Sequence, residues 1–310
     1  MDSEDFMGLF DKLKKKEKKE EVLKQDLDIK EENNQVFIMH LLMKEKVEMP
    51  EKEKTIQVMK KHLGDIDCYN HDEKNVGLAL KDYQVELKEG VMPTILMIMA
   101  CLPMDNFQID TLNRSQMWDC PESNKILDEC KYHVVAVDMM ASLLPYKKRA
   151  ELDMDYMEAL VELFPECEAI YFQTSGKMFT REKIVNHQIP KEDRFIYFAV
   201  NARFFNIQGT NDYIVDTLGM NILGLPDLQY HFHDMNPNWI VNHAYNVASY
   251  IFGSEKIIGN GDYIDGIKEG KIDMSIQWQC HHENSLIQPL RPVIDVCMNE
   301  YSSGNRNYTK

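Results

Sequence analysis

Histidine side chains gather in one short stretch of the C-terminal third of the chain. The run His231-Phe232-His233-Asp234 places two imidazoles two residues apart, and His243 follows on a predicted helix. In a β-strand, residues two apart point to the same side of the sheet, so His231 and His233 would present their rings together. Neutral imidazoles beside a carboxylate can bind a divalent transition metal. The sequence therefore marks His231, His233 and His243 as candidate metal ligands, with Asp234 as a further ligand-binding residue.

The competing interpretation of these histidines is structural. Two-residue spacing often arises by chance, and histidines at the edge of a core are commonly held by hydrogen bonds inside the protein. A second cluster, His281-His282-Glu283, has adjacent histidines, which point to opposite faces of a strand and cannot chelate one ion. The metal hypothesis therefore depends on whether the rings of His231, His233 and His243 converge.

Asn201 and Arg203 belong to an apolar run, Phe195 to Ile207, which is predicted to form a single strand. A buried arginine needs a partner, because an unpaired buried charge is costly. The guanidinium group of Arg203 could bind an anionic ligand, with Asn201 beside it, or form a structural salt bridge. The sequence favours the salt bridge, and the acidic residues available for it are Asp212, Asp216 and Asp227.

The stretch Thr174-Ser175-Gly176-Lys177 is similar to the end of a phosphate-binding loop. It lacks the first glycine of that motif, and Met178 stands where a serine or threonine would hold magnesium. The sequence also has no nucleophile elbow, no His-Glu-x-x-His helix and no dinucleotide fingerprint. These observations favour a protein without catalytic activity.

The chain of 310 residues carries 51 acidic and 35 basic residues, which gives a formal net charge of −16. An acidic surface repels phosphate backbones and so disfavours nucleic-acid binding. Seven cysteines are scattered without a CxxC pair, so reduced, buried thiols are expected rather than disulfides. No secretory signal is visible, and the longest apolar run, residues 91–104, contains two prolines and is too short to span a bilayer. Together these features predict a cytoplasmic protein with no transmembrane segment.

Residues 1–32 form a basic and amphipathic N-terminal tail that differs in composition from the rest of the chain. Apolar side chains at helical spacing give it one small apolar face, at Phe6, Leu9, Phe10 and Leu13. A lysine-rich run, from Lys12 to Lys19, overlaps the end of this face. The tail is expected to be a frayed appendage or a short helix, residues 6–19, that docks weakly on a membrane surface or a protein partner.

From residue 33 onward the pattern is globular and predicts an α+β fold, with mixed or mainly antiparallel sheets and helices packed on one face. Strands are expected at residues 36–43, 75–87, 91–102, 132–139, 169–172, 195–207, 228–233, 275–281 and 292–298. Helices are expected at residues 51–62, 146–164 and 237–252. The segments are grouped as an N-terminal α+β module (33–130), a central α/β segment (131–224), a C-terminal α+β module (225–300) and a polar tail (301–310).

The first and last thirds of the chain follow the same outline of strand, helix, glycine and strands, with a final strand opened by Pro93 or Pro292. This order suits a duplicated module of the split-βαβ, ferredoxin-like type. Residue identity between the two copies is poor, so a single continuous sheet with helices on one side also stays open.

The C-terminal third also resembles a known family. The segments that carry the resemblance are Leu225 to His233, Pro237-Asn238-Trp239, Asn242 to Asn246 and Gly261 to Gly266. They are similar to the bacterial family catalogued as domain of unknown function 4261, the DUF4261 domain-containing proteins. The resemblance is most specific over residues 225–297 and looser from residue 36 onward. It implies a bacterial cytoplasmic protein of accessory or immunity type, and it supplies no activity.

Two functions stay open on the sequence alone. The first is a non-catalytic binding or accessory protein that neutralises or scaffolds a protein partner, in keeping with the acidic composition and the missing catalytic motifs. The second is a metal-binding protein or metal-dependent enzyme that uses His231, His233 and His243, with Asp234 and Arg203 as helpers. The sequence favours the first function.

Overall fold

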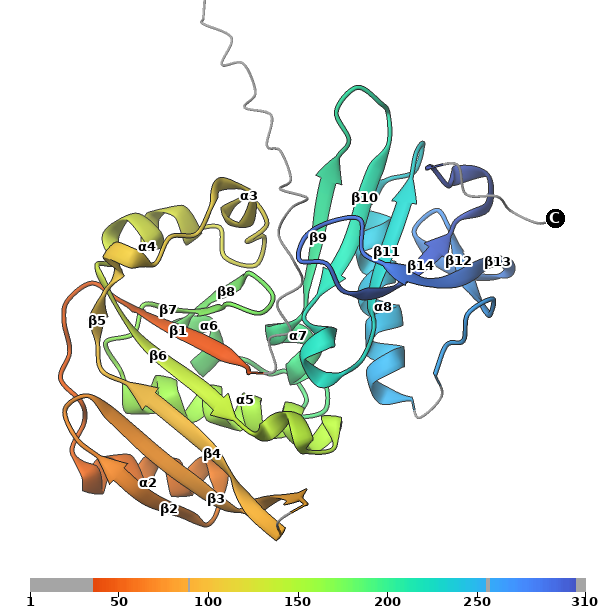
Figure 1. Ribbon diagram of the computed structural model, residues 1–310. Helices are drawn as coiled ribbons and strands as arrows, with labels where there is room; N and C mark the ends of the chain where they lie inside the picture. The colour runs from red at the N-terminus through yellow and green to blue at the C-terminus, as the bar shows by residue number, and fades with distance from the viewer. Residues whose placement is uncertain (1–35, 89, 255–256, 305–310) are drawn as a thin grey trace, which may run out of the picture.

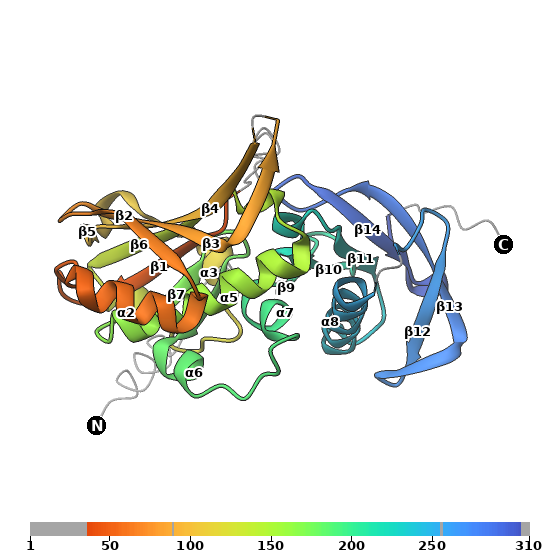
Figure 2. The same cartoon turned by 90° about the horizontal axis from the view of Figure 1, so that it is seen from below.

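The computed structural model describes residues 36–88, 90–254 and 257–304, and the predicted N-terminal tail lies outside these residues. The described chain forms two β-sheets, each with helices packed against it (Figure 1 and Figure 2). Neighbouring strands in the described sheets are antiparallel, except that β11 and β14 run parallel. The predicted α+β class with mainly antiparallel sheets is confirmed.

The N-terminal sheet has the strand order β2-β3-β4-β6-β1-β7-β8, and β5 pairs with β6. Its strands are β1 (Ile38–Met43), β2 (Ile66–His71), β3 (Asn75–Leu87), β4 (Gly90–Met99), β5 (Leu102–Pro103), β6 (Tyr132–Met139), β7 (Ala169–Phe172) and β8 (Lys177–Thr180). The C-terminal sheet has the order β12-β13-β14-β11-β10-β9. Its strands are β9 (Asn201–Asn206), β10 (Tyr213–Leu218), β11 (Asp227–Phe232), β12 (Tyr263–Lys268), β13 (Lys271–Asn284) and β14 (Pro292–Cys297).

Seven helices accompany the sheets in the described residues. They are α2 (Lys52–Leu63), α3 (Thr111–Arg114), α4 (Ser123–Glu129), α5 (Tyr146–Leu163), α6 (Arg181–Val185), α7 (Arg194–Ala199) and α8 (Pro237–Gly253). Helix α2 ends where Gly64 adopts a φ of 80°, a value that favours glycine. Helix α8 begins as predicted, because the side chain of Asn236 accepts a hydrogen bond from the backbone N–H of Asn238, and Pro237 occupies the first turn.

The long helices of each sheet lie on one face, and short helices cover a second face of the N-terminal sheet. Along β1, Met39 and Leu41 belong to the main core beneath α2 and α5, whereas Leu42 packs with Ile126 of α4 on the opposite face. This alternation follows from the two-residue period of a strand. Helix α8 packs against β9, β10 and β11. Figure 1 shows α3 and α4 on the side of the N-terminal sheet away from α5.

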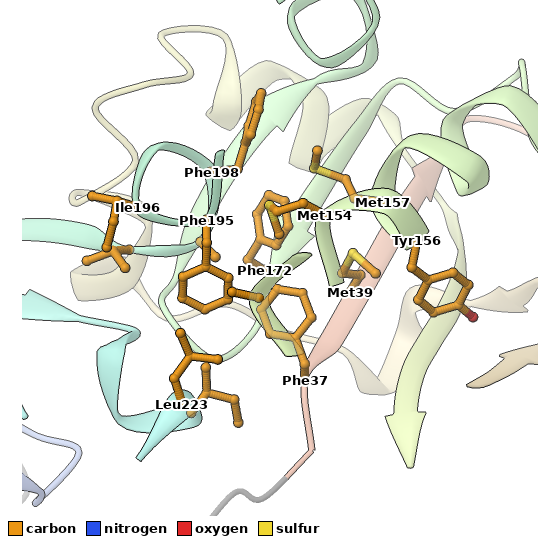
Figure 3. Packing of buried hydrophobic residues seen from close by; sticks show 14 of the residues in the cluster. Phe37, Met39, Met154, Tyr156, Met157, Phe172, Phe195, Ile196, Phe198 and Leu223 are labelled. Atoms are coloured by element: carbon orange, nitrogen blue, oxygen red, sulfur yellow. The ribbon is translucent and has the colours of Figure 1, made fainter. Parts of the chain in front are cut away.

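The two sheets share one hydrophobic core. Phe37 precedes β1, and its ring centroid lies 5.9 Å from that of Phe172 on β7 and 6.1 Å from that of Phe195 on α7. Phe195 in turn stacks on Phe252 of α8, with ring centroids 6.1 Å apart. Figure 3 shows Phe37, Phe172 and Phe195 close to Leu223, which lies in the turn before β11. The two halves therefore pack as one unit.

A buried charged cluster also connects the halves. Arg149 of α5 donates to a carboxylate oxygen of Asp138 at 2.8 Å and to the carbonyl oxygen of Ile222, in the turn before β11. Burial raises the pKa of Asp138 to about 6, although Arg149 acts in the opposite direction. Burial and the neighbouring Asp138 raise the pKa of Asp153 well above its usual value. Asp153 therefore favours the protonated form, which relieves the repulsion between the two acids.

The apolar run at 195–207 is not one strand, which corrects the prediction. Residues 194–199 form α7 and residues 201–206 form β9, because a continuous apolar run fits a buried helix as well as a buried strand. The sheets also divide the chain differently from the predicted modules. Because β6, β7 and β8 belong to the N-terminal sheet, the division falls between β8 and β9 and not at residues 130 and 224.

The two sheets decide between the architectures that the sequence left open. A single continuous sheet is excluded because the strands separate into two sheets. In a split-βαβ unit other strands lie between the two parallel strands that the helix connects, and this holds for β1 and β2 in the first half and for β11 and β12 in the second. The halves share this plan of strand, helix and antiparallel meander. In each half the meander returns to the first strand, so β6 lies beside β1 and β14 beside β11.

All seven cysteines are free thiols, and six of them are buried, as expected from their scattered positions. None of the helices in the described part of the chain has the length and apolar character needed to cross a bilayer.

Candidate functional site

The three candidate metal ligands do not converge. His243, on α8, uses both ring nitrogens inside the protein: Nδ1 is 2.9 Å from the hydroxyl oxygen of Tyr230, and Nε2 is 2.8 Å from the carbonyl oxygen of Asp265. Burial lowers the pKa of His243. Because Tyr230 faces α8, its neighbour His231 points to the opposite face of β11. His231 and His243 thus lie on opposite sides of the sheet.

The other two histidines face acidic residues. His231 Nε2 lies 3.6 Å from a carboxylate oxygen of Asp212, and His233 Nδ1 lies 2.9 Å from a carboxylate oxygen of Asp234. Asp234 is exposed and adopts a φ of 53° at the turn between β11 and α8. No group of three or more histidine, cysteine or acidic residues within the described ranges is arranged to hold a metal ion. The structure therefore does not assemble the predicted site, because alternation along β11 separates His231 from His243.

Arg203 forms a structural salt bridge, the interpretation that the sequence favours. Its Nε and Nη2 atoms donate to the two carboxylate oxygens of Asp216, at 2.9 and 2.5 Å, and Nη1 donates to the carbonyl oxygen of Gln288 at 2.9 Å. Asn201, two residues before Arg203 on β9, has other partners: its amide nitrogen donates to the carbonyl oxygens of Gln116 and Ser175, both at 3.2 Å. Arg203 is only 3% exposed. Its guanidinium group is thus committed to a carboxylate of its own sheet.

Arg203 belongs to a row of polar side chains that crosses the C-terminal sheet. The strand register aligns Arg203 with Asp216, and it then continues through Gln229, Asp295 and His281. We call these five residues the polar row. The amide nitrogen of Gln229 donates to a carboxylate oxygen of Asp295 at 3.0 Å. All members except His281 are buried, so most of the row is a polar layer inside the protein.

Arg291 closes the polar row from the residue before β14. A guanidinium group has five N–H donors, and Arg291 uses all five. Its acceptors are the carboxylates of Asp216 and Asp227 and the carbonyl oxygens of Thr217, Ile287 and Pro289. Burial raises the pKa of Asp227, an effect that Arg291 opposes. Because every donor of Arg291 has an acceptor, this arginine holds the fold together and is not available to an anionic ligand.

A sequence signal for the polar row exists in β11. Asp227, Gln229 and His231 alternate there with apolar and aromatic residues. Such alternation predicts a strand with one polar face and one apolar face. The pattern does not show that the polar face is buried, because its cover comes from a distant part of the chain. That cover includes Leu286, whose backbone N–H donates to the side-chain oxygen of Gln229 at 2.6 Å.

Lys177, in the stretch that is similar to a phosphate-binding loop, is a buried link between the halves. Its Nζ donates to the carbonyl oxygens of Tyr197 and Val200, at 2.6 and 2.9 Å, and to the hydroxyl oxygen of Tyr245 at 3.2 Å. A carboxylate oxygen of Asp119 lies 3.3 Å away. The lysine is only 2% exposed, so internal oxygens surround its charge. This environment accounts for Lys177 without a nucleotide.

A second pair of histidines, which the sequence analysis did not single out, lies inside the N-terminal sheet. Nδ1 of His40 is 3.0 Å from Nδ1 of His133, and Nε2 of His40 is 2.6 Å from the side-chain oxygen of Gln173. An amide oxygen only accepts, so His40 carries its proton on Nε2 and His133 donates from Nδ1. Burial lowers the pKa of His40 to about 4. The two rings come from β1 and β6, and no local sequence pattern predicts a contact between strands that are far apart in the chain.

An apolar groove of about 510 Å³ lies beneath Trp118, where the N-terminal half meets β9 and α8. Its lining residues are Trp118, Asp119, Ala202, Phe204, Pro237, Asn238, Val241 and Tyr245. We call this hollow the Trp118 groove. Trp118 is 58% exposed, whereas Trp278 is 1% exposed. A large exposed aromatic ring beside an apolar groove is typical of a protein-binding surface.

The Trp118 groove runs beside β9, an edge strand of the C-terminal sheet. Two backbone N–H groups on the outer side of β9 are already bonded. The N–H of Ala202 donates to the hydroxyl oxygen of Tyr245 at 3.1 Å, and the N–H of Phe204 donates to the side-chain oxygen of Gln116 at 2.9 Å. The groove therefore offers side chains, rather than these backbone groups, as contact surface.

Comparison with known families gives a match over part of the chain. Residues 216–297 match the family model described as Domain of unknown function (DUF4261). This range begins in β10 and ends with β14, so it contains α8 and most of the C-terminal sheet. The match confirms the resemblance carried by residues 225–297. No curated protein and no solved structure gives a significant match to the chain.

Proposed function

We propose that this chain is a non-catalytic binding protein, of accessory or immunity type, that holds a basic protein partner through the Trp118 groove. The observation that carries the proposal is the 58% exposure of Trp118 at the rim of an apolar groove. Leaving so much apolar surface in water is unfavourable, and tryptophan is enriched among the residues that dominate protein interfaces. An apolar side chain of a partner that enters the groove would cover the Trp118 ring.

The charge of the chain indicates the kind of partner. A net charge of −16 attracts basic proteins over distance and repels acidic ones. Inside the groove, Asp119 is already paired with Lys177. Asp234 is exposed and lies three residues before Pro237, which lines the groove. The complementary segment thus carries an apolar or aromatic anchor next to lysine or arginine, and Asp234 is our candidate contact for that basic residue.

The engagement of the candidate catalytic groups supports a non-catalytic role. Both ring nitrogens of His243 have partners inside the protein. All five donors of Arg291 have acceptors, and Lys177 is surrounded by internal oxygens. Groups that work as nucleophile, base or anion clamp need a free face toward a substrate. We therefore favour binding over chemistry at these residues.

The proposal includes a location in the bacterial cytoplasm. Seven free cysteines, six of them buried, fit a reducing compartment, in which disulfides are rare. The family resemblance is to bacterial proteins. Localisation of a tagged copy by cell fractionation would test this part of the proposal separately from the groove.

The Trp118 groove is tested with a phage-displayed library of random peptides selected on the purified full chain. We expect enrichment of sequences with an aromatic or leucine anchor beside lysine or arginine. Affinities of the selected peptides should fall about 30-fold in a Trp118→Ala variant, which corresponds to a loss of about 2 kcal/mol at one interface tryptophan. They should also fall as salt is raised, because screening weakens the charge attraction.

Tyr250→Ala is the matched control for this experiment. Tyr250 is 52% exposed on α8 but does not line the groove, so its loss should leave peptide affinity unchanged. The proposal fails if no sequence class is enriched, or if the selected peptides bind the Trp118→Ala variant as tightly as the wild-type chain.

A further inference from the structure

The N-terminal tail contains one segment with the chemistry expected of a ligand for the Trp118 groove. We call residues 6–19 the basic segment. It carries six lysines against two acidic residues, and its apolar side chains at helical spacing are Phe6, Leu9, Phe10 and Leu13. Phe10 lies two residues before Lys12, the first of the lysines. An aromatic anchor next to lysine is the pattern that we expect the groove to bind, so the chain carries a candidate occupant in its own sequence.

The basic segment and the rest of the chain are opposite in charge. The segment is positive, whereas the whole chain has a formal net charge of −16. At the groove, Asp119 is paired with Lys177, and Lys183 donates to the carbonyl oxygen of Asp119. Glu122 and Asp234 are exposed, and each lies three residues from a lining residue. The acidic body therefore attracts the lysines of the segment, and Glu122 and Asp234 are acidic groups for them to contact.

The tail joins the body near the groove. The ring of Phe37, at the start of the described chain, packs on Phe195 of α7, and Phe195 stacks on Phe252 of α8 (Figure 3). Helix α7 leads into β9, which forms one wall of the groove. Tyr245, in the opposite wall, lies seven residues before Phe252 on α8, about 10 Å along the helix axis. The elements that receive Phe37 thus also lead to the groove.

The residues between the basic segment and the body are numerous enough to reach the groove. The path from Phe37 along Phe195 and Phe252 to Tyr245 is roughly 25 Å, from the ring separations and the rise of a helix. Residues 20–35 span about 55 Å when extended. Attachment to the same chain gives the segment an effective concentration on the order of 1 mM. At that concentration a contact with a Kd of about 100 µM fills the groove about 90% of the time.

We propose that residues 6–19 occupy the Trp118 groove of their own chain, with Phe10 as the anchor beneath the Trp118 ring. The inference rests on the proposed function, because it concerns the regulation of the same groove. A protein partner has to displace the tail before it can bind. Since the groove is then open about 10% of the time, the apparent affinity for a partner is about tenfold lower than for an open groove.

The experiment uses photo-crosslinking within the full chain, in a Phe10→p-benzoylphenylalanine variant. After irradiation and digestion, mass spectrometry should find position 10 joined to the groove-lining stretches 118–119, 202–204 and 237–245. The yield should not change on dilution, because both sites belong to one chain. Adding Trp118→Ala should lower the yield about 3.5-fold, since a 30-fold weaker contact leaves the groove about 25% occupied. Raising salt should lower the yield as well, because screening weakens the charge attraction.

Two matched variants control for cross-linking by chance. Leu23→p-benzoylphenylalanine places the same reactive group in the tail but outside the basic segment, and it should give at least fivefold less cross-linking to the groove. Tyr250→Ala, added to the Phe10 variant, removes an exposed ring of α8 that does not line the groove, so the yield should stay the same. The proposal is overturned if position 10 reaches no groove residue or joins only a second chain. It is equally overturned if Trp118→Ala leaves the yield unchanged.

A second measurement separates this proposal from the proposed function. A full-chain variant with serine at Phe6, Leu9, Phe10 and Leu13 should bind the library-selected peptides about tenfold more tightly than the wild-type chain. Tyr308→Ser alters an aromatic residue near basic residues at the other end of the chain and should change nothing; a tenfold gain there instead would overturn the proposal. Selected peptides that bind without any cross-link from position 10 would reject the tail and keep the partner. Cross-links to the groove without any enriched peptide would support the tail and reject the partner.

Discussion

Replacing Arg291 with methionine is expected to lower the free energy of unfolding by about 4 kcal/mol, because removing one partner of a buried ion pair leaves the other uncompensated. Here the change deprives two buried carboxylates, those of Asp216 and Asp227, of a shared donor. For a chain of this length the melting temperature should fall by about 6 °C. Urea unfolding and differential scanning calorimetry would measure the two quantities.

The loss of unfolding free energy in the Arg291→Met variant should increase as pH rises. Burial already raises the pKa of Asp227, and loss of Arg291 removes the group that opposes this effect. A carboxyl group with a raised pKa binds its proton more readily in the folded state than in the unfolded chain. Its contribution to stability therefore falls as pH rises through the folded-state pKa. The free energy of unfolding of the variant should therefore lie further below that of the wild-type protein at pH 8 than at pH 4.5.

Two further substitutions test whether the five donors of Arg291, and not charge alone, are responsible. Arg291→Lys keeps the positive charge but cannot reach all five acceptors, so its stability should lie between wild type and Arg291→Met. Arg114→Met breaks a solvent-exposed pair with Asp128 and should cost less than about 1 kcal/mol. Similar losses at Arg114 and Arg291 would contradict the argument.

Between pH 7 and pH 4, the wild-type protein is expected to lose about 3 kcal/mol more unfolding free energy than a His40→Gln variant. The pKa of His40 is lowered by burial from 6.5 to about 4. A histidine with a lowered folded-state pKa contributes stability above pH 6.5 and loses it as pH falls toward 4, because the unfolded chain takes up the proton first. Protonation would also set N–H groups of His40 and His133 against each other across 3.0 Å.

Urea unfolding at closely spaced pH values would test the role of His40. Asp138 acts in the opposite direction: burial raises its pKa to about 6, so its contribution grows as pH falls below 6. Because Asp138 is present in both proteins, its effect cancels in the difference. A His133→Gln variant should also show a shallower pH dependence, since burial lowers the pKa of His133 as well. Curves that run parallel for wild type and His40→Gln would assign the acid sensitivity to other groups.

Local signals in the sequence were sufficient for the elements in which several of them agree. The cap at Asn236 and the proline at Pro237 predicted the start of α8, and the apolar runs at 132–139 and 169–172 coincide with β6 and β7. Elements with weak patterns were missed. Residues 213–218 form β10, but the buried Asp216 interrupts their apolar sequence. This aspartate is accommodated there because it pairs with Arg203 on β9.

Features that depend on distant pairings could not be predicted. Charge limited the candidate partners of Arg203 to Asp212, Asp216 and Asp227. Arg291 also binds Asp216, but it lies far along the chain, and no local pattern links it to these acidic residues. The predicted metal site failed for the same reason, since its geometry depended on which face of β11 meets α8. The Trp118 groove is assembled from a loop, a strand and a helix, so its apolar residues form no recognisable run.

The two bonded N–H groups of β9 have a consequence for how this molecule meets its own copies. An edge strand with open N–H groups is a template on which further strands can add, and growth of that kind ends in aggregates. At Ala202 and Phe204 those positions are taken by Tyr245 and Gln116. Next to an apolar groove, this arrangement lets a partner bind through its side chains, while further strands cannot add to β9 at these two positions.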